Sequence, residues 1–168
     1  HALAARGLTV PTVKATDPVQ GFALIDDLGD DVFDRIPAKD TALRAERTRA
    51  ALDALLHLRT HGAPPETLDH LVDTVRPAGD LPPFDLGALH AELDLLLDWA
   101  FLPISGKPST AQQADSFHAA WRDVLAHVAN TRDGWVLRDV HSPNLIWCAD
   151  RDDIARGGFI DYQDAMRG

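Results

Sequence analysis

The sequence contains one cysteine, no long apolar run and a deficit of positive charge. Because Cys148 has no partner, an internal disulfide is excluded, and this usage fits a reducing compartment, so we expect a cytoplasmic protein. No apolar run approaches the roughly 20 residues that a membrane-spanning helix requires, so we expect no membrane partner. Acidic side chains number 26 and basic ones 16, which argues against nucleic acid as a partner because phosphate backbones are bound by clustered Lys and Arg.

The sequence also lacks the pattern Gly-x-x-x-x-Gly-Lys-Ser/Thr, which excludes a P-loop ATPase within these residues. Hydrophobic residues make up 45% of the 168 residues, enough for the packed core of one domain or a little more. The chain starts at His1 and stops at Gly168, just after its most distinctive motif, so we expect it to be part of a longer protein.

Short β-prone runs lie at both ends of the chain. Residues 8–14 and 21–25 are separated by a Thr-Asp-Pro turn signal and predict a strand pair. The acidic segment 26–31 that follows suits a connector better than the interior of a helix or strand. Three more β-prone runs are predicted in the last third, at residues 135–137, 145–148 and 158–160.

Helical spacing of apolar residues predicts a helical body between these runs. The expected helices are at about residues 40–60, from Pro64 to Pro77, at 86–100 behind an Asp85 cap, and from Ser109, whose Gln112 completes a capping box. On the last helix, the spacing of Phe117 and Trp121 predicts that both lie in the core.

Polar residues that can support chemistry gather in the β-rich last third. Asp139 and Asn144 lie five residues apart in a loop between two predicted strands, and Asp161 ends the next apolar run. If those strands pair, Asp161 lies at the same rim as the loop. A phosphotransferase needs such a set, with one carboxylate beside the attacking hydroxyl and hard oxygen ligands that hold magnesium on the nucleotide phosphates. The joint spacing therefore favours phosphoryl transfer.

Two other interpretations fit parts of this pattern. Asp, Asn, Ser and Pro are common in turns for conformational reasons alone, so each residue taken singly has a purely structural explanation. His141 lies two residues after Asp139, and with Asp161 and Asp164 these residues could form a dinuclear metal site for hydrolysis. The remaining histidines do not form a ligand-spaced set, so this alternative is weaker.

The two stretches together resemble a known family. The runs LRDVHSPNLIW (137–147) and GFIDYQDA (158–165) are similar to the catalytic loop and magnesium motif of the aminoglycoside phosphotransferase and choline kinase-like superfamily. The resemblance is closest to the branch of anomeric sugar kinases that phosphorylate N-acetylmuramate and N-acetylglucosamine in cell-wall recycling. The segment GFALIDDLGD (21–30) resembles the family's last N-lobe strand and hinge.

This resemblance implies an α+β, protein-kinase-like fold with a mostly helical C-lobe. Residues 1–25 would be a remnant of the N-lobe sheet, 26–34 the hinge, and 35–168 the C-lobe with the catalytic and metal-binding loops. The residue roles that the resemblance implies are Asp139 as catalytic base, Asn144 and Asp161 as magnesium ligands, and Asp26, Asp27 and Leu28 as backbone contacts to the adenine of ATP.

The implied reaction is transfer from ATP, with magnesium, to a small molecule, most simply the anomeric hydroxyl of an N-acetylated amino sugar. An aminoglycoside- or choline-type kinase of the same fold, and a non-catalytic nucleotide-binding module, are the alternatives. On the helix at 86–100, Glu92 and Trp99 are weaker candidates for the acceptor side.

The sequence departs from the family pattern at three points. Leu137 stands where most relatives have His, and Tyr162 stands where they have Phe, so we expect altered loop support and retained chemistry. The glycine-rich phosphate loop, the strand lysine and its partner glutamate are not found upstream of residue 8. We therefore expect a missing N-lobe segment of the same protein to be a partner of this chain, and the chain alone to be inactive.

Overall fold

The structure is a computed structural model that describes residues 2–64, 81–127 and 134–168. It divides into two compact units, His1–Leu81 with Leu137–Ala165, and Pro82–Val136 with Met166–Gly168. The helix predicted from Pro64 to Pro77 lies largely outside the described residues. No helix in the described part of the chain is long and apolar enough to span a bilayer.

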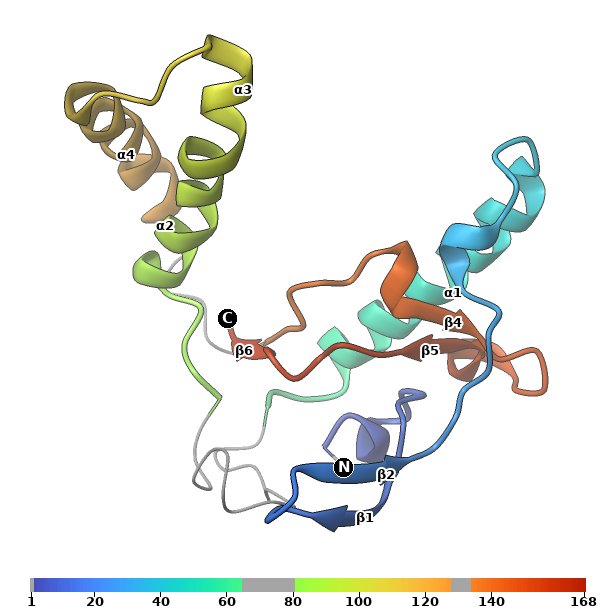
Figure 1. Cartoon of the computed structure of the whole chain (residues 1–168). Helices are drawn as coiled ribbons and strands as arrows, with labels where there is room; N and C mark the ends of the chain where they lie inside the picture. The colour runs from blue at the N-terminus through green and yellow to red at the C-terminus, as the bar shows by residue number, and fades with distance from the viewer. Residues whose placement is uncertain (1, 65–80, 128–133) are drawn as a thin grey trace. The chain divides into compact units, whose positions relative to one another are not determined.

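The first unit opens with a β-hairpin. Strands β1 (Val13–Asp17) and β2 (Phe22–Ile25) pair antiparallel, and Gly21 supplies a positive φ of 75° in the turn between them (Figure 1). The predicted strand at residues 8–14 is wrong in its first half. Residues 8–10 are buried beside a later strand, where Thr9 forms a bridge with Gly158.

Helix α1 (Thr41–Thr60) forms the long element of this unit, as predicted. Asp40 accepts a hydrogen bond from the backbone N–H of Leu43 at 3.0 Å and so caps the N-terminus. The buried stripe of the helix consists of Ala51, Ala54 and Leu58 and, unexpectedly, an arginine.

A second hairpin packs on α1. Strands β4 (Leu145–Trp147) and β5 (Gly157–Phe159) pair antiparallel, with Leu145 opposite Phe159. A Cβ added to Gly157 would lie 3.7 Å from the Ala51 Cα, so the glycine lets the helix approach the strand. Cys148 directly after β4 is buried, and this burial raises the pKa of its thiol, as expected of a small core residue.

Gly158 lets neighbouring atoms approach β5 closely, because it has no side chain. A Cβ there would lie 3.1 Å from Leu28 Cδ1 and 3.2 Å from both Cys148 Sγ and the Ile146 carbonyl oxygen. We predict that Gly158→Ala lowers the free energy of unfolding by about 1–3 kcal/mol, because the backbone oxygen cannot yield. Urea denaturation would measure this loss. Gly157→Ala is the matched control, since its Cβ would meet neighbours only at 3.7–3.8 Å; an equal loss in both variants would contradict the packing argument.

Strand β2 exposes large apolar side chains, with Phe22 68%, Leu24 63% and Ile25 51% accessible. Among the described residues β2 pairs with β1 alone, which leaves its other edge open. We predict that the chain of residues 1–168 self-associates at high concentration and that Leu24→Lys reduces this. Sedimentation would measure it, with Leu56→Lys on α1 as the control because Leu56 is similarly exposed, at 61%. A strictly monomeric chain would refute the prediction.

The second unit is built on two helical segments. The first is a continuous run of α2 (Leu86–Leu95), one π turn (Leu96–Ala100) and α3 (Phe101–Ser105). The predicted Asp85 cap is confirmed by its hydrogen bond from the Ala88 N–H at 3.1 Å. The helix runs past the predicted end at 100, and the π turn precedes Pro103, which has no N–H to donate back along the helix.

The second segment is α4 (Ala111–Leu125), which packs on α2. Its capping box is formed by Thr110 and Gln113, so the prediction of Ser109 and Gln112 was wrong by one residue. Trp121 is 37% exposed and therefore does not lie in the core, where it was predicted. Strands β3 (Trp135–Val136) and β6 (Met166–Arg167) pair antiparallel, and β6 was not predicted.

Short 3₁₀ turns connect these elements. Their bounds are Ala4–Arg6, Phe33–Arg35, Ser142–Asn144 and Asp153–Arg156.

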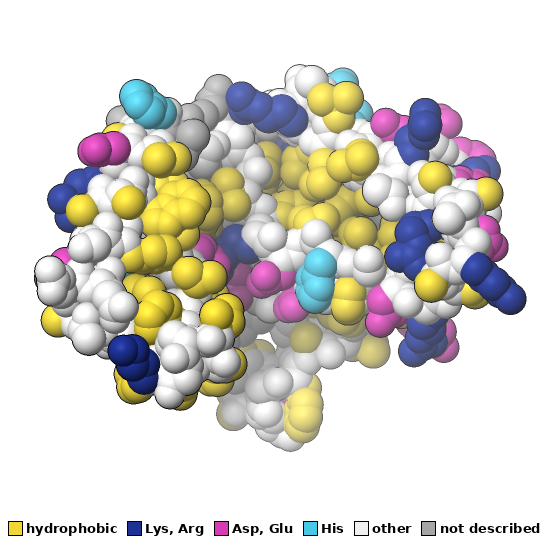
Figure 2. Space-filling view, turned by 90° about the horizontal axis from the view of Figure 1, so that it is seen from above, with side chains coloured by type: hydrophobic (Ala, Val, Ile, Leu, Met, Phe, Trp, Pro, Cys, Tyr) yellow, Lys and Arg dark blue, Asp and Glu magenta, His cyan; other side chains and the backbone are white. Residues whose placement is uncertain are grey.

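Figure 2 shows hydrophobic side chains gathered on the surface of the helical unit, where Trp99 is 77% and Ile104 83% exposed.

Candidate functional site

The loop from Leu137 to Asn144 is wound into a series of tight turns. The N–H of Asp139 bonds to the Leu137 carbonyl at 3.0 Å, and the N–H of His141 bonds to the Asp139 carbonyl at 3.1 Å. Arg138 adopts a left-handed φ of 63°, which is costly for a residue other than glycine. Strained residues of this kind cluster at functional sites, where neighbouring contacts hold them in place.

Asn144 joins the loop to the next motif. Its side-chain Nδ2 donates to the Asp139 carbonyl at 3.0 Å and to Asp161 Oδ2 at 3.2 Å. Its backbone carbonyl accepts the N–H of Ile160 at 3.1 Å, which continues the β4–β5 ladder by one step. Strand pairing therefore brings together two side chains that are 17 residues apart in sequence.

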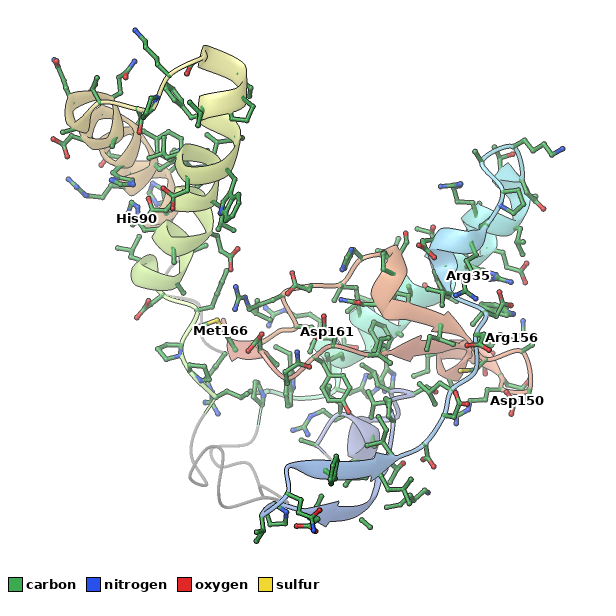
Figure 3. The ribbon with its side chains drawn as sticks, viewed as in Figure 1. Arg35, His90, Asp150, Arg156, Asp161 and Met166 are labelled. Atoms are coloured by element: carbon green, nitrogen blue, oxygen red, sulfur yellow. The ribbon has the colours of Figure 1, made fainter. Side chains whose placement is uncertain are left out.

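Asp161 lies just beyond the end of β5 (Figure 3). It too has a left-handed φ, 59°, a conformation that Asp tolerates better than most residues. Gln163 Nε2 donates to Asp161 Oδ1, so each carboxylate oxygen of Asp161 accepts one side-chain amide. The carboxylate is exposed and anchored by these two hydrogen bonds.

The donor set at this rim fits magnesium. Asp161 provides carboxylate oxygens, and a half-turn of the Asn144 amide would present its oxygen toward the same place. Magnesium prefers a few hard oxygen ligands and keeps several waters, so an exposed carboxylate–amide pair is suitable. The exposed Asp139 carboxylate accepts no hydrogen bond from the described residues, which leaves it available to a substrate hydroxyl.

Asp26 and Asp27, two of the residues expected to contact adenine, make local contacts in the segment after β2. Asp26 accepts hydrogen bonds from Lys14, at 2.9 Å, and from the Thr12 N–H, and the Lys14 contact is the main reason that the pKa of Asp26 lies below its usual value. Asp27 accepts the Gly29 N–H at 2.8 Å in a local turn. Neither carboxylate reaches the Asn144–Asp161 pair through a described hydrogen bond.

Leu28 does approach the hairpin, since its Cδ1 lies over Gly158 of β5. The segment 26–34 and strand β5, which precedes Asp161, therefore belong to the same packed unit. Lys14 on the exposed hairpin forms its ion pair with Asp26.

The dinuclear alternative finds no support in the described part of the chain, where no group of three or more His, Cys, Asp or Glu side chains is arranged to hold a metal ion. His141 is exposed at the loop surface. Glu92 and Trp99, the weaker acceptor candidates, lie in the other unit of the chain, Pro82–Val136 with Met166–Gly168.

Two residues of this unit make contacts that were not predicted from the sequence. Gln163 lies within the run GFIDYQDA and had no predicted role, yet its side chain donates a hydrogen bond to the Asp161 carboxylate. The second is Arg47, on the buried stripe of α1. The sequence did carry a signal for it, because a charged residue at an apolar stripe position needs a partner.

Comparisons with known proteins agree with this geometry. The phosphotransferase enzyme family matches residues 1–168, so this chain belongs to that family, whose fold is protein-kinase-like; the observed helices and small sheets are compatible with it.

Among curated proteins, the chain is 35% identical over 167 residues to the N-acetylmuramate/N-acetylglucosamine kinase of Caulobacter vibrioides, covering 98% of this chain and 43% of the relative. It is 27% identical over 165 residues to the kinase of the same name from Neisseria meningitidis serogroup B, covering 96% of this chain and 43% of that relative. The chain thus spans less than half the length of either relative. The resemblance to this branch is confirmed.

Proposed function

We propose that the full-length protein is an ATP- and magnesium-dependent kinase that phosphorylates the anomeric hydroxyl of an N-acetylated amino sugar. The observation that carries this proposal is the side-chain pair Asn144–Asp161, held at the end of a paired hairpin. Asn144 also bonds to the backbone of Asp139, whose carboxylate accepts no hydrogen bond from the described residues. The two relatives named as N-acetylmuramate/N-acetylglucosamine kinases support the choice of acceptor.

In this proposal Asp139 orients the acceptor hydroxyl and takes its proton as the sugar oxygen bonds to the γ-phosphorus of ATP. The bond from that phosphorus to the bridging oxygen breaks, and ADP leaves. Asn144 and Asp161 would hold magnesium, which when bound would neutralise charge on the nucleotide phosphates. The protein mainly positions these groups, because the transition state of phosphoryl transfer is loose.

The lobe assignment is part of the same proposal. Residues 1–25 form the remnant of the N-lobe sheet, 26–34 the hinge whose backbone at Asp26 to Leu28 contacts adenine, and 35–168 the C-lobe. The packing of Leu28 on Gly158 supports it, since it joins the hinge to the strand that leads to Asp161. A cytoplasmic enzyme of cell-wall sugar recycling would fit the free, buried Cys148.

ADP release by the full-length protein with magnesium-ATP tests the proposal. The acceptors are N-acetylmuramate, N-acetylglucosamine, an aminoglycoside and choline, and the Asp139→Asn variant is the control. Turnover with the amino sugars alone, lost in the variant, is the expected result. Turnover with a cationic acceptor would keep the mechanism and overturn the substrate, and bound ATP without turnover on any acceptor would favour a non-catalytic module.

A further inference from the structure

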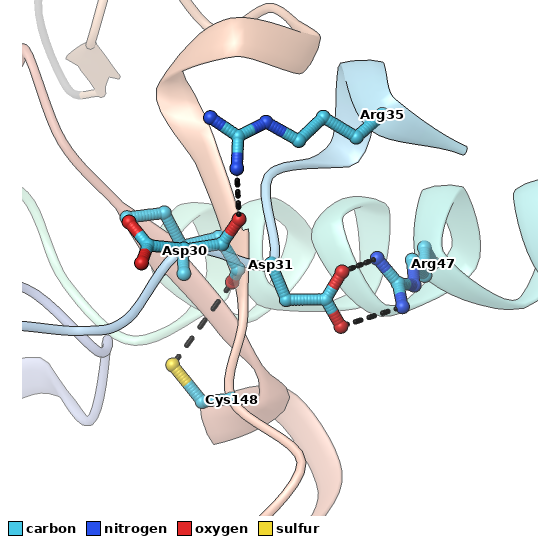
Figure 4. Close-up of polar contacts among 6 residues, drawn as sticks. Asp30, Asp31, Arg35, Arg47 and Cys148 are labelled. Carbon is cyan, nitrogen blue, oxygen red and sulfur yellow. Dashed lines mark hydrogen bonds and ion pairs between the residues drawn. The ribbon is translucent and has the colours of Figure 1, made fainter.

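Arg47 lies buried in α1 and is 7% exposed. Its two terminal nitrogens each donate to one oxygen of Asp31 at 2.7 Å, a bidentate pair (Figure 4). Such a fork fixes both the distance and the orientation of its partners, which a single point charge does not do. The pair therefore ties residues 31–33, which lie within the proposed hinge 26–34, to the helix.

Asp31 is also bound to β4 through its backbone. Its carbonyl accepts the N–H of Trp147 at 2.8 Å, and the next residue, Val32, forms an antiparallel bridge with Ile146. One residue thus engages α1 with its side chain and β4 with its main chain. The segment 31–33 therefore acts as a short extra strand along the edge of the β4–β5 hairpin.

Aromatic rings close around the guanidinium. Its central carbon lies 5.4 Å from the ring centre of Trp147 and 6.0 Å from that of Phe33, and those two rings are 6.3 Å apart. Arginine over an aromatic face gains cation–π attraction, and more so when it is withdrawn from water. Arg47 therefore sits at the junction of α1, the segment 31–33 and β4.

This junction lies close in sequence to the candidate ligands. The bridge at Ile146 is two residues from Asn144, and β4 pairs with β5, which leads into Asp161. A shift of β4 along the segment 31–33 would carry Asn144 with it and change the 3.2 Å spacing to Asp161. Magnesium is exacting about ligand geometry, so a small displacement here affects metal binding directly.

We propose that Arg47 is a positioning residue for the metal site: through Asp31 it holds β4 in the place that presents Asn144, paired with Asp161, to the magnesium–nucleotide complex. The inference rests on the proposed function. A purely structural role would lower stability and leave the magnesium dependence of the folded enzyme unchanged. The two roles are separable by experiment.

The test uses the full-length protein and two variants. Asp31→Asn with Arg47→Met removes both charges together, which avoids a buried unpaired ion, and Arg47→Lys keeps the charge but loses the fork. The readouts are the magnesium concentration that gives half-maximal ADP release, the affinity for ATP in the presence of EDTA, and the melting temperature. Arg49→Met is the matched control, an exposed arginine of the same helix.

The double variant is expected to need about tenfold more magnesium, the loss typical when a residue supporting a metal ligand is removed, with metal-free ATP affinity unchanged. Arg47→Lys should fall between it and the wild type and provides the reading if the double variant fails to fold. Arg49→Met should match the wild type. Unchanged magnesium dependence in folded variants overturns the inference alone. A wild type with no magnesium-dependent nucleotide binding overturns the proposed function, and this inference with it.

Discussion

Replacing Asp139 with asparagine should remove nearly all turnover while leaving magnesium–ATP binding close to that of the wild type. A positioned general base contributes roughly 10²–10⁴-fold to rate, and phosphoryl transfer to a sugar hydroxyl has to dispose of that proton. The expected drop in kcat is therefore at least about 10²-fold. Steady-state ADP release and calorimetric titration of magnesium–ATP measure the two quantities.

Asp139→Asn changes the carboxylate and leaves the described hydrogen bond to Asn144 in place. The only described hydrogen bond between Asp139 and Asn144 uses the Asp139 carbonyl, which the variant retains. Asn144 therefore keeps its support, and loss of turnover cannot be attributed to a displaced magnesium ligand. Asp150→Asn, an exposed change between β4 and β5, is the matched control and should leave kcat unaltered. Retained turnover in Asp139→Asn would refute the assignment of the base.

Replacing Asp161 should weaken magnesium–nucleotide binding itself. Asp161→Ala removes the only carboxylate that the Asn144 side chain contacts among the described residues, and about a tenfold to hundredfold loss of magnesium affinity is the minimum expected. Asp161→Asn should behave similarly, because it keeps the side-chain shape and removes the charge. Titration of nucleotide at several magnesium concentrations provides the measurement.

Backbone strain has to be separated from metal binding in this experiment. Alanine at a left-handed φ costs about 1–2 kcal/mol, whereas asparagine tolerates it. Asp153→Ala is the control for strain, since Asp153 also has a positive φ, 48°, and lies in the turn between β4 and β5. If that variant lost magnesium affinity as well, or if Asp161→Asn retained it fully, the metal would have been assigned to the wrong residue.

Local signals in the sequence predicted the elements that depend on local interactions. The long helix at 41–60, the Asp85 cap and the β-prone runs that became β4 and β5 follow from side-chain spacing and capping chemistry within a few residues. The juxtaposition of Asn144 with Asp161 was accessible too, because it requires only that two neighbouring runs pair.

Features that depend on contacts between distant parts of the chain could not be predicted from the sequence. Residues 8–10 have strand-like composition, but they are buried beside β5 instead of extending the first hairpin. Trp121 has core spacing, yet the residue is 37% exposed, because spacing along one helix does not say which neighbours cover it. The partnership of Arg47 with Asp31, 16 residues away, depends on how α1 lies against the segment 31–33, which no local pattern reports.

The turn that connects β4 and β5 lies at the opposite end of the hairpin from Asn144 and Asp161, where Asp150 and Arg156 are labelled in Figure 3. Residues 149–153 in that turn are exposed, and the ladder between the strands is complete before the turn begins. The chain can therefore be lengthened or chemically tagged at Asp150 without moving the Asn144–Asp161 pair. A fluorophore placed there would report on the hairpin when nucleotide is added, while remaining a full strand length from the candidate site.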